Sequence, residues 1–539
     1  MSAKDTILKM LRKIIPDLRE ADVVVPEGQT AHYATTVAFR LAKEQGKSPA
    51  AVAAILARDI KESAPKGFFE KVEVAGPGFV NFSLTPAALN AGLAGILKSG
   101  KKYGASKAAA GRKVQVEFVS ANPTGPLTLA NGRGGFLGDV LGNVLRLAGA
   151  KVEKEYYVND TGHQVLTLGQ SILAAAGIIG DEESFYKGGY VRDWAQKNAT
   201  LVRKMQKDPM ALGERAAKDF LGLIKKAVGD KARIRFDRYT SEKAVHKAGL
   251  PQKAMEIFRK AGYVYESDGA VWLKTTSFGD DKDRVLVTSA GEPTYFLSDA
   301  GHYLETKKRG FEEKINILGP DHYGYVKRIQ SVAKILDFKR SEVVITQAIR
   351  LMKDGAEFKM SKRKGNFITF EDLVDEVGLD VARFFFLMLA PSTHMDFDMG
   401  LAKERSNKNP VYYVEYAYVR AKGILKKAGA VKLNAKFLAL LDTPEDQRLV
   451  RALLEFPGII EATAGDYQVH RLTRYAIDLA RDFQQFYEKE RIIPARRSLS
   501  VDGGEPKELQ NARLALVRAT AVVFEGLFSV LGISAPKKM

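Results

Sequence analysis

The chain is 539 residues long, 45% of its residues are hydrophobic, and 83 Lys and Arg against 64 Asp and Glu give it a formal net charge of +19. This length is too great for one hydrophobic core and predicts three or four domains. The absence of cysteine excludes disulfides, thiolate nucleophiles and cysteine-ligated zinc or iron–sulfur centres. The net charge indicates a polyanionic partner, and a basic surface without a specific ligand is the alternative.

The first region, residues 1–110, has the pattern of a small α+β domain. Apolar residues at helical spacing predict three helices, and two alternating segments joined by Gly76-Pro77-Gly78 predict a hairpin over 69–84. Acidic residues stand near the start, where a signal or transit peptide avoids them, and no apolar run approaches the roughly 20 residues of a membrane helix. We therefore expect a cytoplasmic protein without a membrane partner.

The middle region, residues 111–405, predicts a doubly wound parallel sheet. A strand over 114–120, a helix over 134–148 and a strand over 152–158 form a βαβ unit. Mainly helical text over about 165–285 predicts an insertion that splits this Rossmann-type domain. Residues 406–539 predict an all-α bundle. The expected fold class is therefore α/β, with an N-terminal α+β domain and a C-terminal all-α bundle.

Two segments of the middle region contain residues suited to phosphate chemistry. Small and turn-forming residues fill 122–133, where the first strand passes to its helix and backbone N–H groups can approach an anion. Residues 358–365 place four cations beside a Ser and a Gly, and such clusters neutralise charge on a transferring phosphoryl or nucleotidyl group. Each segment taken alone also has a simpler explanation. Residues 122–133 fit an ordinary crossover loop, and residues 358–365 fit a solvated basic turn.

Together the two segments resemble the "HIGH" and "KMSKS" signatures of class I aminoacyl-tRNA synthetases, and KMSKR at 359–363 matches the second at four of five positions. The surrounding text resembles, more narrowly, the bacterial arginyl-tRNA synthetases. The segments that carry this resemblance are VEFVSANPTGPL, EYYVNDTGHQ, TYFLSDAGHY, ILGPDHYGYVKR, KMSKRKGNFIT and NPVYYVEYAYVR. The resemblance extends over essentially the whole chain.

The resemblance implies an arginine pocket. Tyr295 and Asp299 stand four residues apart and so share a helix face, and a phenol beside a carboxylate suits a guanidinium. The family resemblance assigns the arginine side chain to these two residues and implies that Glu117 and Asn122 complete the pocket. An acid on a helix surface is the alternative for Asp299.

The resemblance also implies an ATP site. Lys359 and Lys362 are the expected catalytic cations, which stabilise the α-phosphate and the leaving pyrophosphate while the adenylate forms. The other expected ATP contacts are Pro123, Thr124, Gly125, Ala130, Gly132, His322, Met360 and Ser361. A loop histidine without a ligand is the alternative for His322. ATP with Mg²⁺ is the expected cofactor set, with no zinc and no structural metal.

The first signature departs from the family pattern, because Thr128-Leu129-Ala130-Asn131 stands where His-x-Gly-His is usual. A Thr hydroxyl and an Asn amide are still donors, so Thr128 and Asn131 are the expected catalytic replacements. Ala130 adds a methyl group where Gly lets the adenine lie against the backbone. A non-catalytic tRNA-binding relative is therefore the alternative function, and a pocket for another amino acid is a third interpretation.

Aromatic residues near the start of the last region predict RNA contacts. Tyrosines 412, 413, 416 and 418 precede Arg420, and unpaired bases stack on such rings and guanidinium planes. Tyr412, Tyr416 and Arg420 are the expected tRNA contacts, and a buried helix with core tyrosines is the alternative. The resemblance implies that residues 406–539 bind the anticodon and 1–110 the outer corner of the tRNA.

The implied activity is ATP-dependent ligation of L-arginine to tRNA(Arg) through an arginyl-adenylate. The implied enzyme is a monomer, and its activation of arginine requires bound tRNA.

Overall fold

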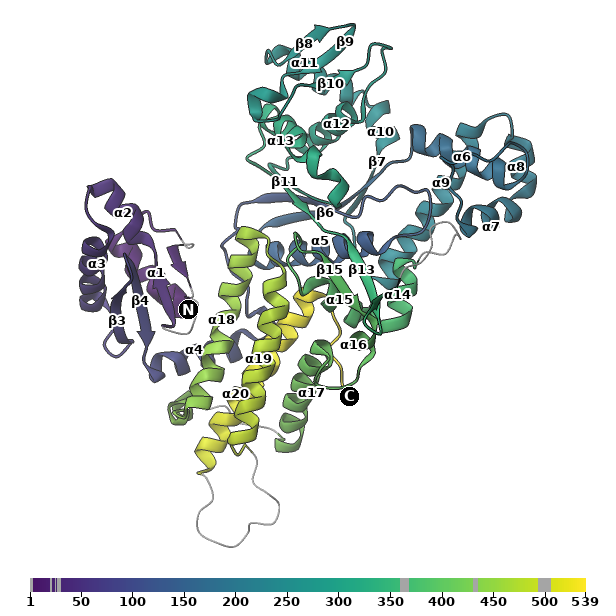
Figure 1. The fold of residues 1–539 in the computed structure, drawn as a ribbon. Helices are drawn as coiled ribbons and strands as arrows, with labels where there is room; N and C mark the ends of the chain where they lie inside the picture. Colours follow the sequence, from purple (N-terminus) through teal and green to yellow (C-terminus); the bar gives the residue numbers. More distant parts are fainter. Residues whose placement is uncertain are drawn as a thin grey trace. The chain divides into compact units, whose positions relative to one another are not determined.

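The computed structural model describes residues 3–19, 22–24, 26, 31–358, 368–429, 435–492 and 506–539 (Figure 1). The chain divides into two compact units. One unit contains residues 1–109 together with 405–539, and the other contains residues 110–404. The mixed α/β composition with a parallel sheet, an N-terminal domain and a C-terminal helical domain confirms the predicted fold class.

A five-stranded parallel sheet forms the centre of the unit 110–404. Its strand order is β12–β11–β5–β6–β7. From β5 the chain adds β6 and β7 on one side, and it then adds β11 and β12 on the other side. This is the doubly wound arrangement. Its ligands bind where the strand order reverses, which here is between β5 and β11. The strands are β5 (Lys113–Glu117), β6 (Lys151–Val158), β7 (Arg238–Ser241), β11 (Glu313–Leu318) and β12 (Arg340–Ile345).

Helix α5 (Leu129–Leu147) connects β5 to β6 and begins five residues before the predicted start. Glycines 132, 134 and 135 weaken the helical pattern of its first turns, because glycine has low helix propensity. The Thr128 cap and burial of this segment against the sheet outweigh that propensity.

The chain between β6 and β11 contains two small subdomains, and β7 lies between them. Strand β7 falls within the range expected as one insertion, 165–285, and pairs with β6 in the main sheet. The first subdomain is helical: α6 (His163–Ala175), α7 (Gly189–Lys197), α8 (Ala199–Met205) and α9 (Pro209–Lys226). The second adds α10 (Glu242–Lys247), α11 (Leu250–Lys260) and the antiparallel strands β8 (Val264–Ser267), β9 (Ala270–Leu273) and β10 (Arg284–Val287).

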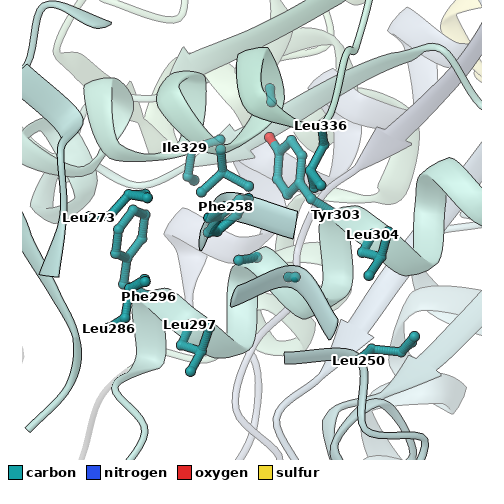
Figure 2. Packing of buried hydrophobic residues seen from close by; sticks show 14 of the residues in the cluster. Leu250, Phe258, Leu273, Leu286, Phe296, Leu297, Tyr303, Leu304, Ile329 and Leu336 are labelled. Carbon is teal, nitrogen blue, oxygen red and sulfur yellow. The ribbon is translucent and has the colours of Figure 1, made fainter. Parts of the chain in front are cut away.

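Helix α12 (Tyr295–Lys308) joins the second subdomain to β11 and separates a hydrophobic core from a polar face. Figure 2 shows Phe296, Leu297, Tyr303 and Leu304 of α12 in the core, together with side chains of α11 and of α13 (Val326–Ile335). These positions follow the helical spacing i, i+1, i+7 and i+8. The opposite face of α12 is therefore free to present polar side chains to the carboxyl ends of the strands.

The remainder of this unit follows β12. A three-stranded sheet has the order β14–β13–β15, formed by β13 (Ile349–Lys353), β14 (Ala356–Glu357) and β15 (Met395–Asp398). Helices α14 (Phe370–Val377), α15 (Leu379–Leu387) and α16 (Met399–Lys403) complete the unit. Helices α14 and α15 both pack against α5.

The unit 1–109 with 405–539 contains a four-stranded sheet and a helical bundle. The sheet order is β1–β2–β4–β3, from β1 (Val23–Val24), β2 (Tyr33–Thr35), β3 (Phe69–Ala75) and β4 (Phe79–Leu84), and the antiparallel pair β3–β4 confirms the predicted hairpin. Its helices are α1 (Ala3–Ile14), α2 (Val37–Gln45), α3 (Pro49–Ser63) and α4 (Pro86–Ser99), followed by α17 (Pro410–Ala428), α18 (Pro444–Asp466), α19 (His470–Lys489) and α20 (Lys507–Leu531).

Helix α20 is the central helix of this bundle and packs against α4, α17, α18 and α19. Among the described residues it is the one helix long and apolar enough to cross a membrane, with a mean hydropathy of 1.8 in its most apolar window. However, 72% of that window is buried inside the protein. The apolar character of α20 is thus accounted for by packing within the bundle.

A buried carboxylate, Asp139 of α5, links the sheet to α15. It contacts the Arg383 guanidinium of α15 and accepts a hydrogen bond from Lys154 Nζ of β6 at 2.6 Å. Burial lowers the pKa of Lys154 to about 7 and that of Arg383 to about 9. Asp139 is thus the anion that allows two cations to remain charged beneath the sheet.

We expect Asp139→Asn to lower the free energy of unfolding by about 3–5 kcal/mol, because Lys154 and Arg383 then lose the one carboxylate that contacts both. Urea denaturation would measure this loss. The matched control is Glu376→Gln, which removes the exposed partner of Lys403 and is expected to change stability by less than about 1 kcal/mol. Equal effects of the two substitutions would contradict the assigned role of Asp139.

Candidate active site

The residues expected to bind arginine lie at the carboxyl end of β5, in the loop after it, and at the start of α12. Glu117 is the last residue of β5 and is paired in register with Asn316 of β11, at the point where the strand order reverses. Asn122 lies in the loop after β5 and accepts a hydrogen bond from Asn159, which follows β6, at 2.8 Å. The Tyr295 hydroxyl lies next to Gly162, which is in the loop after β6.

The backbone after β5 has an unusual conformation. Val119 and Ser120 have φ angles of 65° and 36°, and a β-branched residue such as Val119 seldom adopts a positive φ. This turn places the Ser120 hydroxyl where it donates to Glu117 Oε1 at 3.2 Å and accepts from the Tyr157 backbone N–H at 3.1 Å. The strained turn therefore ties the ends of β5 and β6 together.

Glu117 belongs to a buried ionic cluster that also contains Glu155, His302 and Lys314. Lys314 Nζ is 3.0 Å from Glu117 Oε2 and 3.8 Å from Glu155 Oε2, and it donates to Gln115 Oε1 at 2.6 Å. His302 Nε2 lies 2.9 Å from Glu155 Oε2. The His302 contact and the nearby Lys314 charge lower the pKa of Glu155 despite its burial. Glu155 therefore stays ionised.

Glu117, Glu155 and His302 are also the one group of three potential metal ligands among the described residues. A cation bound between them would lie beside the fully buried Lys314 ammonium. The cluster thus already contains its positive charge, and Asn316 Nδ2 supplies a further hydrogen bond to Glu117 Oε2 at 2.7 Å. This donor set suits an ammonium better than a metal ion.

The polar face of α12 presents Tyr295, Asp299 and His302, one above the other at spacings of four and three residues. Asp299 Oδ2 accepts a hydrogen bond from the Tyr325 hydroxyl at 2.7 Å. Burial raises the pKa of Asp299 to about 6, and the nearby charge of Glu117 adds to the shift against the opposing effect of the Tyr325 bond. Asp299 is thus a partly buried carboxylate that gains from a cationic ligand.

Several residues expected to contact ATP also have packing roles. Pro123 and Thr124 are buried. A side chain at Gly125 would lie 2.7 Å from the Tyr190 ring, and one at Gly132 would lie 2.2 Å from the Phe370 ring. Both glycines are therefore needed for close approach of an aromatic side chain, whether or not a nucleotide binds. Ala130 is exposed, and so is His322 in the turn after β11.

Thr128 and Asn131 form a capping box at the start of α5. Asn131 Oδ1 accepts from the Thr128 backbone N–H at 2.9 Å and from its hydroxyl at 2.8 Å, while the Asn131 N–H donates to the Thr128 hydroxyl. Among described residues, the Asn131 side-chain NH₂ has no bonded partner, so it remains a donor for a ligand. Both residues thus stabilise the start of α5, a role that does not follow from their alignment with His-x-Gly-His.

Some expected site residues lie elsewhere. Lys359, Met360, Ser361 and Lys362 lie outside the described residues. Tyr412, Tyr416 and Arg420 belong to the other unit, where the rings of Tyr412 and Tyr416 are parallel with centroids 6.4 Å apart. Arg420 donates to the Tyr416 hydroxyl, and its guanidinium lies 4.8 Å from the Tyr416 ring and 4.4 Å from the Tyr487 ring. Tyr418, in contrast, is a core residue that packs on Phe524 and Phe528.

The structure adds residues that sequence reasoning missed. Glu155, Lys314 and His302 are not among the predicted site residues, although charged residues such as Glu155 and Lys314 within strands buried on both faces are unusual enough to be a signal. Tyr325 lies in the same segment as His322, ILGPDHYGYVKR, and it, rather than His322, contacts Asp299.

Comparisons with known proteins match three successive parts of the chain to family models of aminoacyl-tRNA synthetases. The family model described as "Arginyl tRNA synthetase N terminal domain" matches residues 1–84, "tRNA synthetases class I (R), catalytic domain" matches 92–385, and "DALR anticodon binding domain" matches 414–539. The arginine–tRNA ligase of Citrifermentans bemidjiense is 41% identical over 94% of this chain and 92% of its own length. The chain belongs to the arginyl-tRNA synthetase family. The arginine–tRNA ligase of Frankia alni is 39% identical over 99% of both chains.

Solved structures agree on the fold of this family member. The arginyl-tRNA synthetase of Thermus thermophilus matches it with a TM-score of 0.74 over 99% of each chain, at 22% identity. A class I synthetase fold with an N-terminal domain and a helical C-terminal domain is therefore common to both. The class I catalytic domain implies use of ATP.

The raised pKa of Asp299 predicts a pH-dependent gain in stability for Asp299→Asn. Because the folded value of about 6 exceeds the ordinary 3.8, this group makes the folded state progressively less stable as pH rises from about 4 to 6. Asparagine removes that charge and keeps an acceptor for Tyr325. We expect a stability gain of about 3 kcal/mol at pH 8 and about 1.5 kcal/mol at pH 5.

Thermal unfolding of both proteins at the two pH values would measure these gains. A variant equally stabilised at both, or destabilised at pH 8, would show that Asp299 is not held in an unfavourable charged state.

Proposed function

We propose that this chain ligates L-arginine to tRNA(Arg) at the expense of ATP, through an arginyl-adenylate. The observation that carries the proposal is a pair of carboxylates in a chain of this family. Glu117 lies where the order of the class I sheet reverses, and its charge acts on Asp299 of α12. A pocket lined by acids at this point suits a cationic amino acid. Arginine carries two cationic groups and so matches the pocket.

In this proposal each arginine group has a partner. Asp299 and Tyr295 receive the guanidinium, since a carboxylate accepts its paired N–H donors and a ring lies beside its plane. Glu117 and Asn122 complete the pocket near the reacting end. Glu117 is suited to this role because Lys314 and Asn316 occupy Oε2, while Oε1 accepts only the 3.2 Å bond from Ser120 within the described structure.

ATP lies, in the proposal, over the loop after β5 and the start of α5. Pro123, Thr124, Gly125, Ala130, Gly132, His322, Met360 and Ser361 form its site. Thr128 and Asn131 donate to the phosphates, and the Asn131 NH₂ is oriented for this by the capping box. Lys359 and Lys362 neutralise the charge that develops on the α-phosphate and the leaving pyrophosphate. Mg²⁺ bound with ATP would supply further charge neutralisation, and no zinc is required.

The tRNA contacts belong to the other unit. Stacked Tyr412 and Tyr416, with Arg420 beside Tyr487, offer parallel planes on which unpaired anticodon bases can stack. We assign residues 406–539 to the anticodon, 1–110 to the outer corner of the tRNA and 111–405 to catalysis. The comparisons do not favour a non-catalytic relative. A monomeric state, a cytoplasmic location and a tRNA requirement for activation stay predictions.

Charging of total tRNA with labelled arginine and ATP tests the proposal. We expect the wild-type protein to charge arginine and Lys362→Ala to lose about 10²- to 10³-fold in rate, because a donor to a charged transition state is removed. Lys308→Ala, which removes an exposed cation of α12, is the matched control and is expected to retain activity. Wild-type protein that binds tRNA but does not charge it would instead support the non-catalytic alternative.

Asn131→His in the same assay distinguishes the two tasks of Asn131. If activity rises, a histidine donor was the missing element; if activity falls, the capping box is the more important contribution.

Arg420→Ala tests the proposed RNA contact. We expect the KM for tRNA to rise about ten-fold or more, because a stacking plane is lost, while the KM for arginine stays unchanged. Lys426→Ala, which removes an exposed cation from the same helix, is expected to have a smaller effect. Equal effects of the two substitutions would indicate a purely electrostatic contribution.

A further inference from the structure

Tyr157, near the end of β6, has a buried hydroxyl group without a hydrogen-bond partner among the described residues. The side chain is only 5% exposed. Buried hydroxyl groups are nearly always bonded, and one that is not calls for an explanation. Its neighbour on the strand, Tyr156, follows the rule and donates to the Ala121 carbonyl at 2.7 Å.

The position of the Tyr157 ring is fixed from two sides. The ring stacks on His302 with centroids 4.0 Å apart and planes 12° from parallel. His302 is in turn held by Glu155, and the Tyr157 backbone is held by Ser120. The hydroxyl therefore cannot turn away to find a partner without disrupting the buried ionic cluster.

Carboxyl groups from four different segments lie close enough to Tyr157 for their charges to act on its hydroxyl. They are Glu242 at the start of α10, Asp299 on α12, Glu117 on β5 and Asp160 after β6, and their charges add to burial in raising the pKa of Tyr157 well above its ordinary value. Tyr157 thus remains a neutral phenol. Three of these acids already accept hydrogen bonds from other residues: Asp299 from Tyr325, Glu117 from Asn316, and Asp160 from Ser241.

We infer that the Tyr157 hydroxyl is a further contact for the arginine substrate and that its oxygen accepts an N–H from one of the two cationic groups. This inference rests on the proposed function. The surrounding carboxylates attract a cation and repel the α-carboxylate of arginine, so an N–H group is the partner that the local charge favours. The hydroxyl oxygen thus gains a hydrogen-bond donor only when substrate is present.

Tyr157→Phe is the decisive variant, because the free protein loses no hydrogen bond with the hydroxyl. We expect the KM for arginine in aminoacylation to rise about 10- to 100-fold, as for loss of a bond to a charged group, with kcat and the KM for ATP within about two-fold of wild type. The melting temperature is expected to stay the same or rise. The control is Tyr475→Phe in the bundle, which loses a partnered bond to the Ala452 carbonyl and is expected to melt earlier with an unchanged KM for arginine.

Inhibition by agmatine, which has both cationic groups of arginine and no carboxylate, identifies the contact. If Tyr157→Phe raises the inhibition constant of agmatine by the same factor as the KM for arginine, an N–H contact is supported. Weakened arginine use with unchanged inhibition by agmatine would overturn the N–H assignment. An unchanged KM for arginine, or a melting temperature lowered as in Tyr475→Phe, would overturn the inference altogether.

If the wild-type protein does not charge tRNA, the proposed function fails, and titration calorimetry with arginine separates the two outcomes. Weaker arginine binding by Tyr157→Phe than by wild type would still support the contact, whereas equal binding or none by either protein would overturn it.

Discussion

The contact between Lys314 and Glu117 is the interaction on which the proposed arginine pocket depends. Lys314 lies on β11 and Glu117 on β5, the two strands between which the sheet order reverses. The same ammonium also lies close to Glu155 on β6, and Glu155 holds His302 on α12. One buried positive charge thus links three strands and the helix that carries Tyr295 and Asp299. Burial of so many charges is tolerable only because each has a partner at close range.

Helix α12, which carries two of the proposed pocket residues, is apolar and packed on one face and polar on the other. The core face of α12 packs against α11 and α13 through Phe296, Leu297, Tyr303 and Leu304, as Figure 2 shows. The opposite face is held in register by His302. Glu117 and Asp299 therefore lie on elements that packing and ionic contacts already hold in place, which reduces the ordering that a ligand must impose.

Much of the fold could be predicted from the sequence, because periodicity and turn residues identify the βαβ unit, the hairpin over 69–84 and the helical character of the last region. The start of α5 was missed because glycines hide a helix that tertiary packing stabilises. Strand β7 was missed because four residues carry little periodic signal. In the site, spacing identified the shared face of Tyr295 and Asp299. It could not identify Tyr157, Glu155 or Lys314, whose roles arise from contacts between strands far apart in the chain.

The capping box at the start of α5 has a consequence for how this protein family can change. Thr128 and Asn131 satisfy each other's hydrogen bonds, so the two positions are not independent. Replacing either residue alone leaves the other without its partner at an exposed helix end, and an imidazole in place of Asn131 has no amide oxygen for the Thr128 N–H. The two positions are therefore energetically coupled, and a stepwise route between this pair and two histidines passes through intermediates with a weaker helix start.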